Sequence, residues 1–346
     1  MGRGSPPAGL ALVCGVLLLI WLPVQAPGPS LGAHPAVGWL YLRDGRLPAP
    51  GEELVQVLAV GDVMPGRGVA AGEGHEDPLA AVAPWLRAAD LALGNLECVL
   101  GAGEGSGGRP PSSAAGQPVR LHAPASAAAM LAGAGFDLLG LANNHTLDGG
   151  PGGLSATAAL LEQAGIEPVG AGPGPEAAFR PVVRRVRGLR LAFLAFNAVP
   201  GPDPLPAGDV WAPAAWDAAT EGRVIAAVAA ARVQADAVIV MLHWGYEYDR
   251  RSDPGQRAMA RALLEAGADL VVGHHPHVPQ EMESWSAAQQ AAAPEAGRQG
   301  LVAYSLGNLL FDQEQGEARH GLALRAYFDR QGLRAVQALP LRAGPR

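Results

Sequence analysis

The chain has 346 residues, of which 49% are hydrophobic and 16% are charged. This balance is typical of a folded globular protein and excludes an intrinsically disordered chain. The formal net charge of −7 argues against binding to nucleic acid, because nucleic-acid-binding surfaces are usually basic.

The N-terminal segment predicts export. Arg3 precedes an apolar stretch over residues 8–26 that ends in a small-residue cleavage pattern, as in a signal peptide. The same stretch is long enough to remain uncleaved as a single membrane anchor. Residues 1–26 are therefore interpreted as a signal peptide or a membrane anchor. The protein is expected outside the cytoplasm, either membrane-anchored or secreted.

The rest of the chain predicts one domain behind a linker. Residues 27–53 are rich in Pro and Gly and predict the linker, which places the domain at 54–343. Residues 101–117 predict a low-complexity loop, and 285–299 a polar insertion. Strands are expected at 54–60, 91–93, 137–142, 190–197, 237–242, 269–272, 301–306, 321–328 and 333–341, and helices at 78–89, 126–134, 153–164, 218–234 and 254–266. This alternation predicts α/β layers around mainly parallel strands, with an antiparallel end.

Polar side chains follow the first two predicted strands. Asp62 comes after Gly61, where it is either a carboxylate presented at a strand end or part of an ordinary turn. Arg67 could face an anionic substrate or cap a helix. Asn95 and Glu97 both follow the second strand. Because residues two apart on an extended segment share a face, either one could point to the same site.

Cysteine usage excludes an internal disulfide in the mature domain, since Cys14 and Cys98 are the only two cysteines. Cys98 directly follows Glu97 and could be a nucleophile. A lone cysteine after a strand is more often a small buried hydrophobic residue, and this second interpretation is preferred.

A run of polar residues follows the strand predicted at 137–142. Asn143, Asn144 and His145 come directly after it, and burying two amides and an imidazole is costly unless they are hydrogen-bonded or coordinated. Asn and His can bind metal, and His145 could also donate a proton to a leaving oxygen. Asp148 could orient His145. The alternative is an asparagine-rich turn that caps the next helix.

Four histidines follow two of the later strands. His243, considered alone, is more often structural than a metal ligand. His274, His275 and His277 lie within four residues of each other, which packing does not easily explain. His275 and His277 form an HxH pair, and on an extended segment this spacing places both rings on one side, as a metal requires.

Together these residues favour a metal centre. The turn with Asn308 and Asp312 could line the same pocket or be plainly structural. Carboxylates, amides and imidazoles delivered from several strand ends suit a two-metal hydrolytic site. A single structural zinc held by the histidines would leave Asp62, Glu97 and Asn144 unexplained. Signals of other chemistries, such as a nucleophile elbow or a phosphate-binding loop, are absent from the sequence.

The chain resembles the CapA family of poly-γ-glutamate capsule biosynthesis proteins, within the calcineurin-like metallophosphoesterase superfamily. Six segments over about residues 54–312 match in the family's order. They are Gly61-Asp62-Val63-Met64 with Arg67, Asn95-Leu96-Glu97, Ala142-Asn143-Asn144-His145 with Asp148, His243-Trp244-Gly245 with Glu247, His275-Pro276-His277-Val278 with Gln280, and Tyr304-Ser305-Leu306-Gly307-Asn308 with Phe311-Asp312.

The resemblance implies a four-layer α/β/β/α sandwich with a site for two divalent metal ions, Mn, Fe or Zn, at the strand ends. The implied metal ligands are Asp62, Glu97, Asn144, His243, His275 and His277, and the expected catalytic residues are His145, Arg67 and Asp148. The superfamily's first motif is usually Asp-x-His, whereas this chain has Met64 at the histidine position. One usual ligand is therefore missing or replaced, and Glu97 is expected in place of the usual bridging aspartate.

Two functions are compatible with these expectations. The first is an exported phosphoester hydrolase in which two metals activate a water, while Arg67 and His145 stabilise the developing charge. The second is a non-catalytic, membrane-tethered subunit that assists poly-γ-glutamate synthesis or export. The expected partners are a phosphoester or acidic-polymer substrate and membrane-bound poly-γ-glutamate synthase subunits. Nucleic acid is not an expected partner.

Overall fold

The structure is a computed structural model that describes residues 38–43, 45, 47–49, 51–67, 69, 77–101, 119–201, 205, 208, 210–286, 298–313 and 316–342. The predicted signal peptide or anchor at 1–26 lies outside the described residues, as does the predicted loop after Gly101. Within the described part of the chain, no helix is long and apolar enough to cross a membrane.

The first of two large sheets has eight strands in the described residues, in the order β1-β18-β17-β2-β3-β6-β7, with β16 paired to β2. Its strands are β1 (Trp39–Leu42), β2 (Val55–Val63), β3 (Leu91–Leu96), β6 (Leu138–Gly140), β7 (Glu167–Val169), β16 (Asn308–Leu310), β17 (His320–Asp329) and β18 (Gly332–Arg342). The β2, β3, β6, β7 and β16 strands are parallel, and β17, β18 and β1 continue the sheet antiparallel. The sheet is therefore mixed.

The second large sheet has six strands in the same described part, in the order β14-β15-β13-β12-β10-β9. These strands are β9 (Val182–Val186), β10 (Leu189–Asn197), β12 (Ala237–His243), β13 (Leu270–His274), β14 (Met282–Ser286) and β15 (Gln299–Ala303). Its four central strands are parallel and its two edge strands antiparallel. Two small pairs join β4 (Val99–Leu100) to β5 (His122–Ala123) and β8 (Ala171–Pro173) to β11 (Trp211–Pro213).

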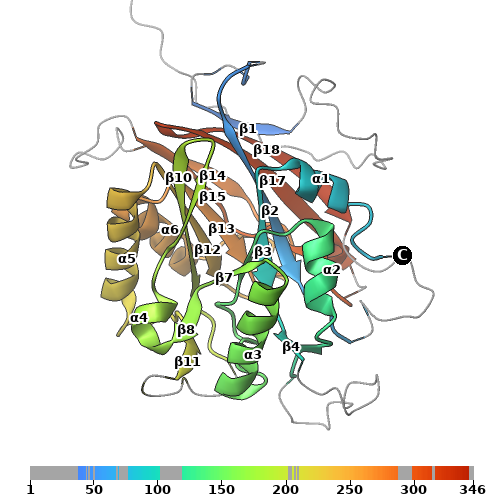
Figure 1. Cartoon of the computed structure of the whole chain (residues 1–346). Helices are drawn as coiled ribbons and strands as arrows, with labels where there is room; N and C mark the ends of the chain where they lie inside the picture. Colours follow the sequence, from blue (N-terminus) through green and yellow to red (C-terminus); the bar gives the residue numbers. More distant parts are fainter. Residues whose placement is uncertain are drawn as a thin grey trace, which may run out of the picture.

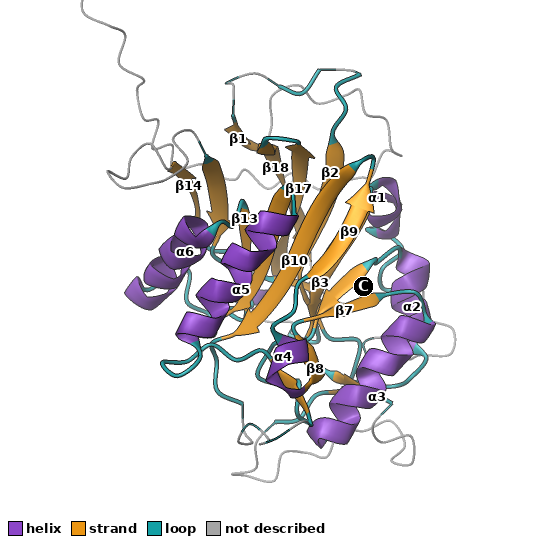
Figure 2. Cartoon of the chain, turned by 60° about the vertical axis from the view of Figure 1, so that its left-hand side comes forward, coloured by secondary structure: helices purple, strands orange, loops and turns teal. Residues whose placement is uncertain are grey.

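The two sheets pack face to face, and helices cover their outer faces (Figure 1, Figure 2). The helices are α1 (Ala83–Ala88), α2 (Ala127–Ala134), α3 (Gly150–Gln163), α4 (Gly174–Ala178), α5 (Glu221–Gln234), α6 (Pro254–Ala266) and the 3₁₀ helix η2 (Gly316–Arg319). The α1, α2 and α3 helices lie on the first sheet, while α5 and α6 lie on the second. The core between the sheets includes Leu93, Phe193 and Val272, which are fully buried.

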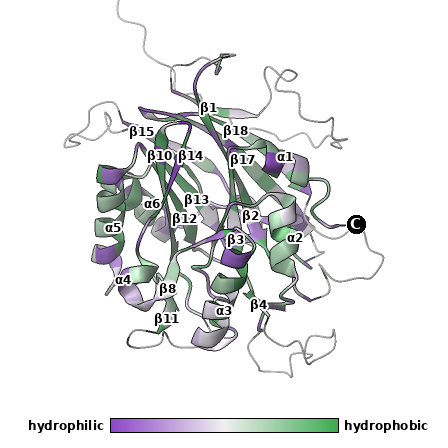
Figure 3. Cartoon of the chain, in the orientation of Figure 1, coloured by the Kyte–Doolittle hydropathy of each residue, from purple (hydrophilic) through white to green (hydrophobic). Residues whose placement is uncertain are grey.

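Burial on both faces explains the long apolar runs of the parallel strands. All seven residues of β12 are buried, so this strand shows no alternation of apolar and polar residues. The strands colour mostly as hydrophobic, whereas the helices carry hydrophilic segments toward solvent (Figure 3). The polar residues that end the strands stand out against this apolar background.

The predicted α/β class is confirmed, with two mixed sheets, but several boundaries differ, three of them for a clear physical reason. The predicted linker at 27–53 contains β1, which pairs with β18, so the sheet begins before residue 54. The helix predicted at 78–89 begins only at Ala83, because a proline fits a helix only in its first turn, and here it is Pro84. The predicted insertion at 285–299 contains the end of β14 and the start of β15, an antiparallel pair.

Candidate metal centre

The polar residues at the strand ends converge from both sheets. Asp62 lies near the end of β2, and Glu97 directly follows β3. His243 ends β12, and His275 and His277 follow β13. The carboxyl ends of parallel strands lie at one edge of a sheet, where ligand sites of α/β proteins usually form. Because the two sheets face each other, their side chains meet at this edge.

Three groups of candidate metal ligands form within the described residues. In each group the ligand atoms lie within 4.8 Å of one another. The groups are Glu97 with His243 and His275, Asp62 with Glu97 and His277, and Glu247 with His275 and His277. Five of the six predicted ligands are in these groups, and Glu97 belongs to two of them. His275 and His277 likewise belong to two groups each, so the three groups overlap.

The surroundings of the Glu97 carboxylate show best whether these residues fit a bound metal ion. The side chain of Glu97 is fully buried, yet within the described part of the chain neither carboxylate oxygen has a hydrogen-bond partner. Its Oε1 lies 3.6 Å from His277 Nε2 and 4.0 Å from His243 Nε2. The buried Nδ1 of His275 also has no partner. Leaving such groups unpaired is costly, so these residues fit bound cations, and the mixed oxygen and nitrogen donors suit several divalent metals.

Asp62 is part of this site and not of an exposed turn. It is fully buried within β2, and its Oδ1 accepts a hydrogen bond of 2.8 Å from Asn95 Nδ2. Its Oδ2 accepts from the backbone N–H of His275 at 3.1 Å. The sequence left open whether Asn95 or Glu97 points to the site. In the structure both side chains face the same cluster. Asn95 holds Asp62, while the carboxylate of Glu97 has no hydrogen-bond partner among the described residues and lies beside His243 and His277.

The turn after β6 brings two of its predicted residues to the site. Asn144 Oδ1 lies 2.8 Å from His243 Nε2. His145 Nδ1 lies 2.8 Å from Asp148 Oδ2, the orienting contact expected from the sequence. Asn143 is structural, because its Nδ2 donates to Asn95 Oδ1 and to the carbonyl of Leu96. The turn is therefore bonded to β3, the strand that Glu97 directly follows.

The histidine-rich segment corrects one detail of the sequence interpretation. The backbone at His275 and His277 is not extended, since φ is 94° and 58°. Such positive φ values are strained for residues other than glycine and often mark functional loops. Their ring centroids are 5.9 Å apart, so both still reach the cluster. His274 turns away, and its Nε2 lies 3.2 Å from the carbonyl of Val60, which agrees with leaving it out of the ligand set.

Asn308 has a positioning role that the sequence did not distinguish from a structural turn. Its Nδ2 lies 3.1 Å from the carbonyl of Ala318, which can only accept, so this contact fixes the orientation of the amide. Its Oδ1 then lies 3.0 Å from His277 Nδ1 and must accept a hydrogen bond from this nitrogen. This bond leaves His277 Nε2 directed at Glu97 Oε1. Metal-bound histidines are commonly oriented in this way through their other ring nitrogen.

Arg67 lies at the edge of the site and not among the ligands. It forms an ion pair with Asp312 and does not cap a helix. Its guanidinium carbon is 6.0 Å from the ring centroid of Phe311. That ring lies 4.8 Å from the ring of His277. Phe311 thus contacts both Arg67 and the candidate ligand His277.

Three further residues complete the description of the site. Met64, at the usual histidine position, is buried in the core, and its sulfur accepts from the N–H of Gly66 at 3.2 Å. Cys98 is buried, and burial raises the pKa of its thiol, which favours the hydrophobic interpretation over a nucleophile. Glu247 was not predicted as a ligand, although it stands four residues after His243. Glu247 does not directly follow an apolar run in the sequence, so no predicted strand end pointed to it.

The buried cluster binds protons when no cation occupies it. Burial raises the pKa of Glu97 well above its ordinary value; the charge of His277 opposes this shift and the carboxylates of Asp62 and Glu247 add to it. Burial would lower the pKa of His277, but Glu97 and Asp62 raise it to about 9. Burial and the charge of His277 lower the pKa of His275 to about 4. His275 is therefore neutral and His277 protonated at neutral pH.

Metal binding is expected to release protons and to strengthen with rising pH. A cation bound by His277 must displace its proton, so affinity should increase about tenfold per pH unit up to about pH 9 and then level off. Titration calorimetry at pH 7, repeated in two buffers of different ionisation enthalpy, should give at least one proton released per chain. Proton-independent binding would contradict His277 as a ligand.

The fold and the site define a mixed α/β protein whose strand ends enclose carboxylate and imidazole clusters that could hold metal ions. The chain belongs to the bacterial capsule synthesis protein PGA_cap family, whose profile matches residues 56–313. The resemblance to CapA proteins is thereby confirmed.

Two curated relatives support this family assignment. The capsule biosynthesis protein CapA of Bacillus anthracis is 30% identical over 298 residues, which cover 84% of this chain and 67% of that protein. The PGA biosynthesis protein CapA of Bacillus subtilis is 29% identical over 304 residues, 84% of this chain and 72% of that protein. A solved structure, a hypothetical protein from Thermus thermophilus, aligns with a TM-score of 0.48 and 19% identity, covering 84% of this chain and all of that one.

Proposed function

We propose that this chain is an exported, metal-dependent phosphoester hydrolase of capsule biosynthesis. The observation that carries the proposal is the buried carboxylate of Glu97, whose unpartnered oxygens lie beside His243 and His277. Two divalent ions, Mn, Fe or Zn, would be held by Asp62, Glu97, Asn144, His243, His275 and His277. We assign the helix-covered pair of sheets to the four-layer α/β/β/α architecture of the metallophosphoesterase superfamily.

In the proposed mechanism the metals and the side chains of this protein have different roles. When bound, the metals supply Lewis-acid stabilisation of the phosphoryl oxygens and a more acidic water. His145 donates a proton to the leaving oxygen. Its Nδ1 is bonded to Asp148, so Nε2 remains for this transfer, and the carboxylate stabilises the charged ring. Arg67, at the rim, attracts the anionic substrate and stabilises charge on the phosphoryl group.

The proposed setting is the outer side of the cytoplasmic membrane. The apolar segment at 1–26 would export the chain and either leave it anchored or be removed. The relatives are named for capsule and PGA biosynthesis. On that basis the proposed partners are membrane-bound poly-γ-glutamate synthase subunits and a phosphoester or acidic-polymer substrate. The negative net charge disfavours nucleic acid.

Metal content and hydrolysis together test the proposal. The full-length protein, purified without chelators and offered Mn, Fe and Zn, should contain about two metals per chain and hydrolyse p-nitrophenyl phosphate. A chelator should remove both the metal and the activity, and added metal should restore them. A folded, metal-loaded protein that hydrolyses no phosphoester would contradict the enzyme and favour the alternative, a non-catalytic subunit tethered to the membrane.

A further inference from the structure

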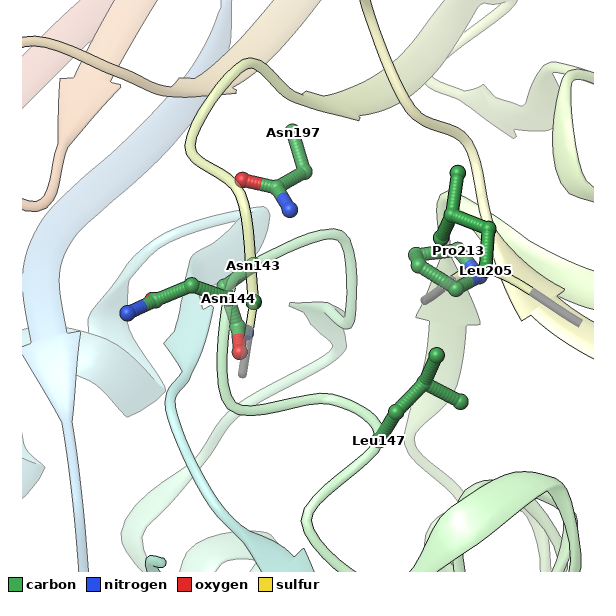
Figure 4. Close-up of a pocket in the computed structure, with 7 residues that line it drawn as sticks. Asn143, Asn144, Leu147, Asn197, Leu205 and Pro213 are labelled. Atoms are coloured by element: carbon green, nitrogen blue, oxygen red, sulfur yellow. The ribbon is translucent and has the colours of Figure 1, made fainter. Parts of the chain in front are cut away.

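A small pocket lies directly beside the metal centre. It is lined by Asn143, Asn144, Asn197, Leu147, Leu205 and Pro213, among others (Figure 4). Two of these residues also contact or adjoin a candidate ligand. Asn144 Oδ1 lies 2.8 Å from His243 Nε2, and Asn197, at the end of β10, is the register partner of His243. A molecule bound at the metals therefore has this pocket as a neighbour.

The pocket has a polar side and an apolar side. The three asparagines lie on one side, and Leu147, Leu205 and Pro213 lie on the other (Figure 4). No charged side chain is among the described residues that line it. A carboxylate placed there would meet no cation, and an ammonium group would meet no carboxylate. Because an unpaired charge is costly against apolar surface, the pocket favours an uncharged group.

The free hydrogen-bonding capacity narrows the chemistry further. Asn197 is largely engaged, since its amide exchanges two hydrogen bonds with the backbone of Val199, at 2.9 and 3.0 Å. Asn143 is held by Asn95 and Leu96, as described above. Asn144 uses its oxygen toward His243, while its Nδ2 makes no hydrogen bond to the residues that the structure describes. Asn144, which lines the pocket, therefore has an N–H donor that is free among the described residues, and such a donor suits a hydroxyl or another neutral acceptor.

We propose that this pocket receives the alcohol part of the phosphoester, and that this part is uncharged and carries a hydroxyl group. The inference rests on the proposed hydrolase function. His145 belongs to the same turn as Asn144 and Leu147, so the leaving oxygen lies at the pocket entrance. Water adds to phosphorus and gives up one proton to solvent, the bond between phosphorus and the alcohol oxygen breaks, and that oxygen takes a proton from His145, which regains one from solvent. The products are the neutral alcohol, in the pocket, and inorganic phosphate.

Three two-carbon phosphoesters that differ in one group test this specificity. They are 2-hydroxyethyl phosphate, phosphoglycolate and phosphoethanolamine, which carry a hydroxyl, a carboxylate and an ammonium group. With metal-loaded full-length protein, kcat/KM for the hydroxyl ester is expected to exceed the values for both charged esters by at least about tenfold, which corresponds to about 1.4 kcal/mol. Calorimetry with the matching non-hydrolysable phosphonates should give the same order of affinity.

A pair of variants at Leu205 provides the matched control. Leu205 lines the pocket but is 48% exposed, so a charged side chain there should not disturb folding. Leu205→Lys should raise kcat/KM for phosphoglycolate several-fold, and Leu205→Glu should do the same for phosphoethanolamine. The readout is the ratio of kcat/KM for each charged ester to kcat/KM for 2-hydroxyethyl phosphate, measured with the same variant, because a change of pocket shape alone would not raise this ratio for one sign of charge only.

The outcomes separate the pocket from the hydrolase proposal. Equal rates with all three esters, or a preference for a charged ester in the wild type, would overturn the assigned pocket chemistry while leaving hydrolysis established. Charge effects absent from both Leu205 variants would also overturn it. If no ester is hydrolysed, the hydrolase proposal fails, and the phosphonate affinities still decide whether the pocket selects an uncharged group.

Discussion

Replacing Glu97 with Gln is expected to abolish tight metal binding without destabilising the metal-free protein. The carboxylate is fully buried, and neither oxygen has a hydrogen-bond partner among the described residues. Burial outweighs the opposing charge of His277 and raises the pKa of Glu97, so the charged carboxylate contributes little to folding without a cation. Removing its charge should therefore leave the free energy of unfolding unchanged or raise it by about 1 kcal/mol. Metal affinity should fall by more than about 100-fold, since loss of a residue that merely orients a ligand already costs about 10- to 100-fold.

The matched control is Asp269→Asn, a change at another buried carboxylate. Asp269 Oδ2 accepts from Arg232 Nη1 and from the backbone N–H of Val238, each at 2.7 Å. Its replacement should cost about 1.5–3 kcal/mol of stability, the range for hydrogen bonds to charged groups, and leave metal affinity unchanged. Chemical denaturation of the metal-free proteins and calorimetric titration with Mn or Zn measure both quantities. A Glu97→Gln variant that loses stability but keeps its metal would show that Glu97 is structural.

The parts of the fold that the sequence revealed are those with a strong periodic pattern. The strands β2, β10, β12 and β13 are continuous apolar runs because both of their faces are buried, and each was expected within one to three residues at either end. The edge strand β1 was missed because it lies in a segment rich in Pro and Gly. It owes its conformation to pairing with β18, a contact distant in the sequence.

Some residues of the candidate site could likewise be predicted from the sequence, whereas others could not. Asp62, Glu97 and His243 were noticed because each is a polar residue that interrupts or ends an apolar run. Asn308 was left between two interpretations, since its role depends on the carbonyl of Ala318 and the ring of His277, which only the fold brings together. The HxH spacing identified His275 and His277 but suggested the wrong backbone. Residue spacing alone does not reveal a positive φ at a residue other than glycine.

His145→Ala is expected to lower phosphoester turnover by about 10²- to 10⁴-fold, the range for loss of a general acid, while metal content stays at the wild-type value. The ring is bonded to Asp148, and it is absent from the three ligand groups that the described residues form. The loss should be smallest for esters with a good leaving group, such as p-nitrophenyl phosphate, because these need little protonation. The expected signature is therefore a loss that grows with the pKa of the leaving alcohol.

The control for this variant is a neighbouring histidine that faces away from the site. His274 is buried and its Nε2 contacts the carbonyl of Val60 in β2. His274→Gln, which keeps a donor for that carbonyl, should lower stability and leave turnover per folded, metal-loaded chain within about threefold. If His145→Ala lost metal as well as activity, His145 would belong among the ligands. If its loss were the same for good and poor leaving groups, the proton would have to come from another donor, and the assignment of His145 as general acid would be wrong.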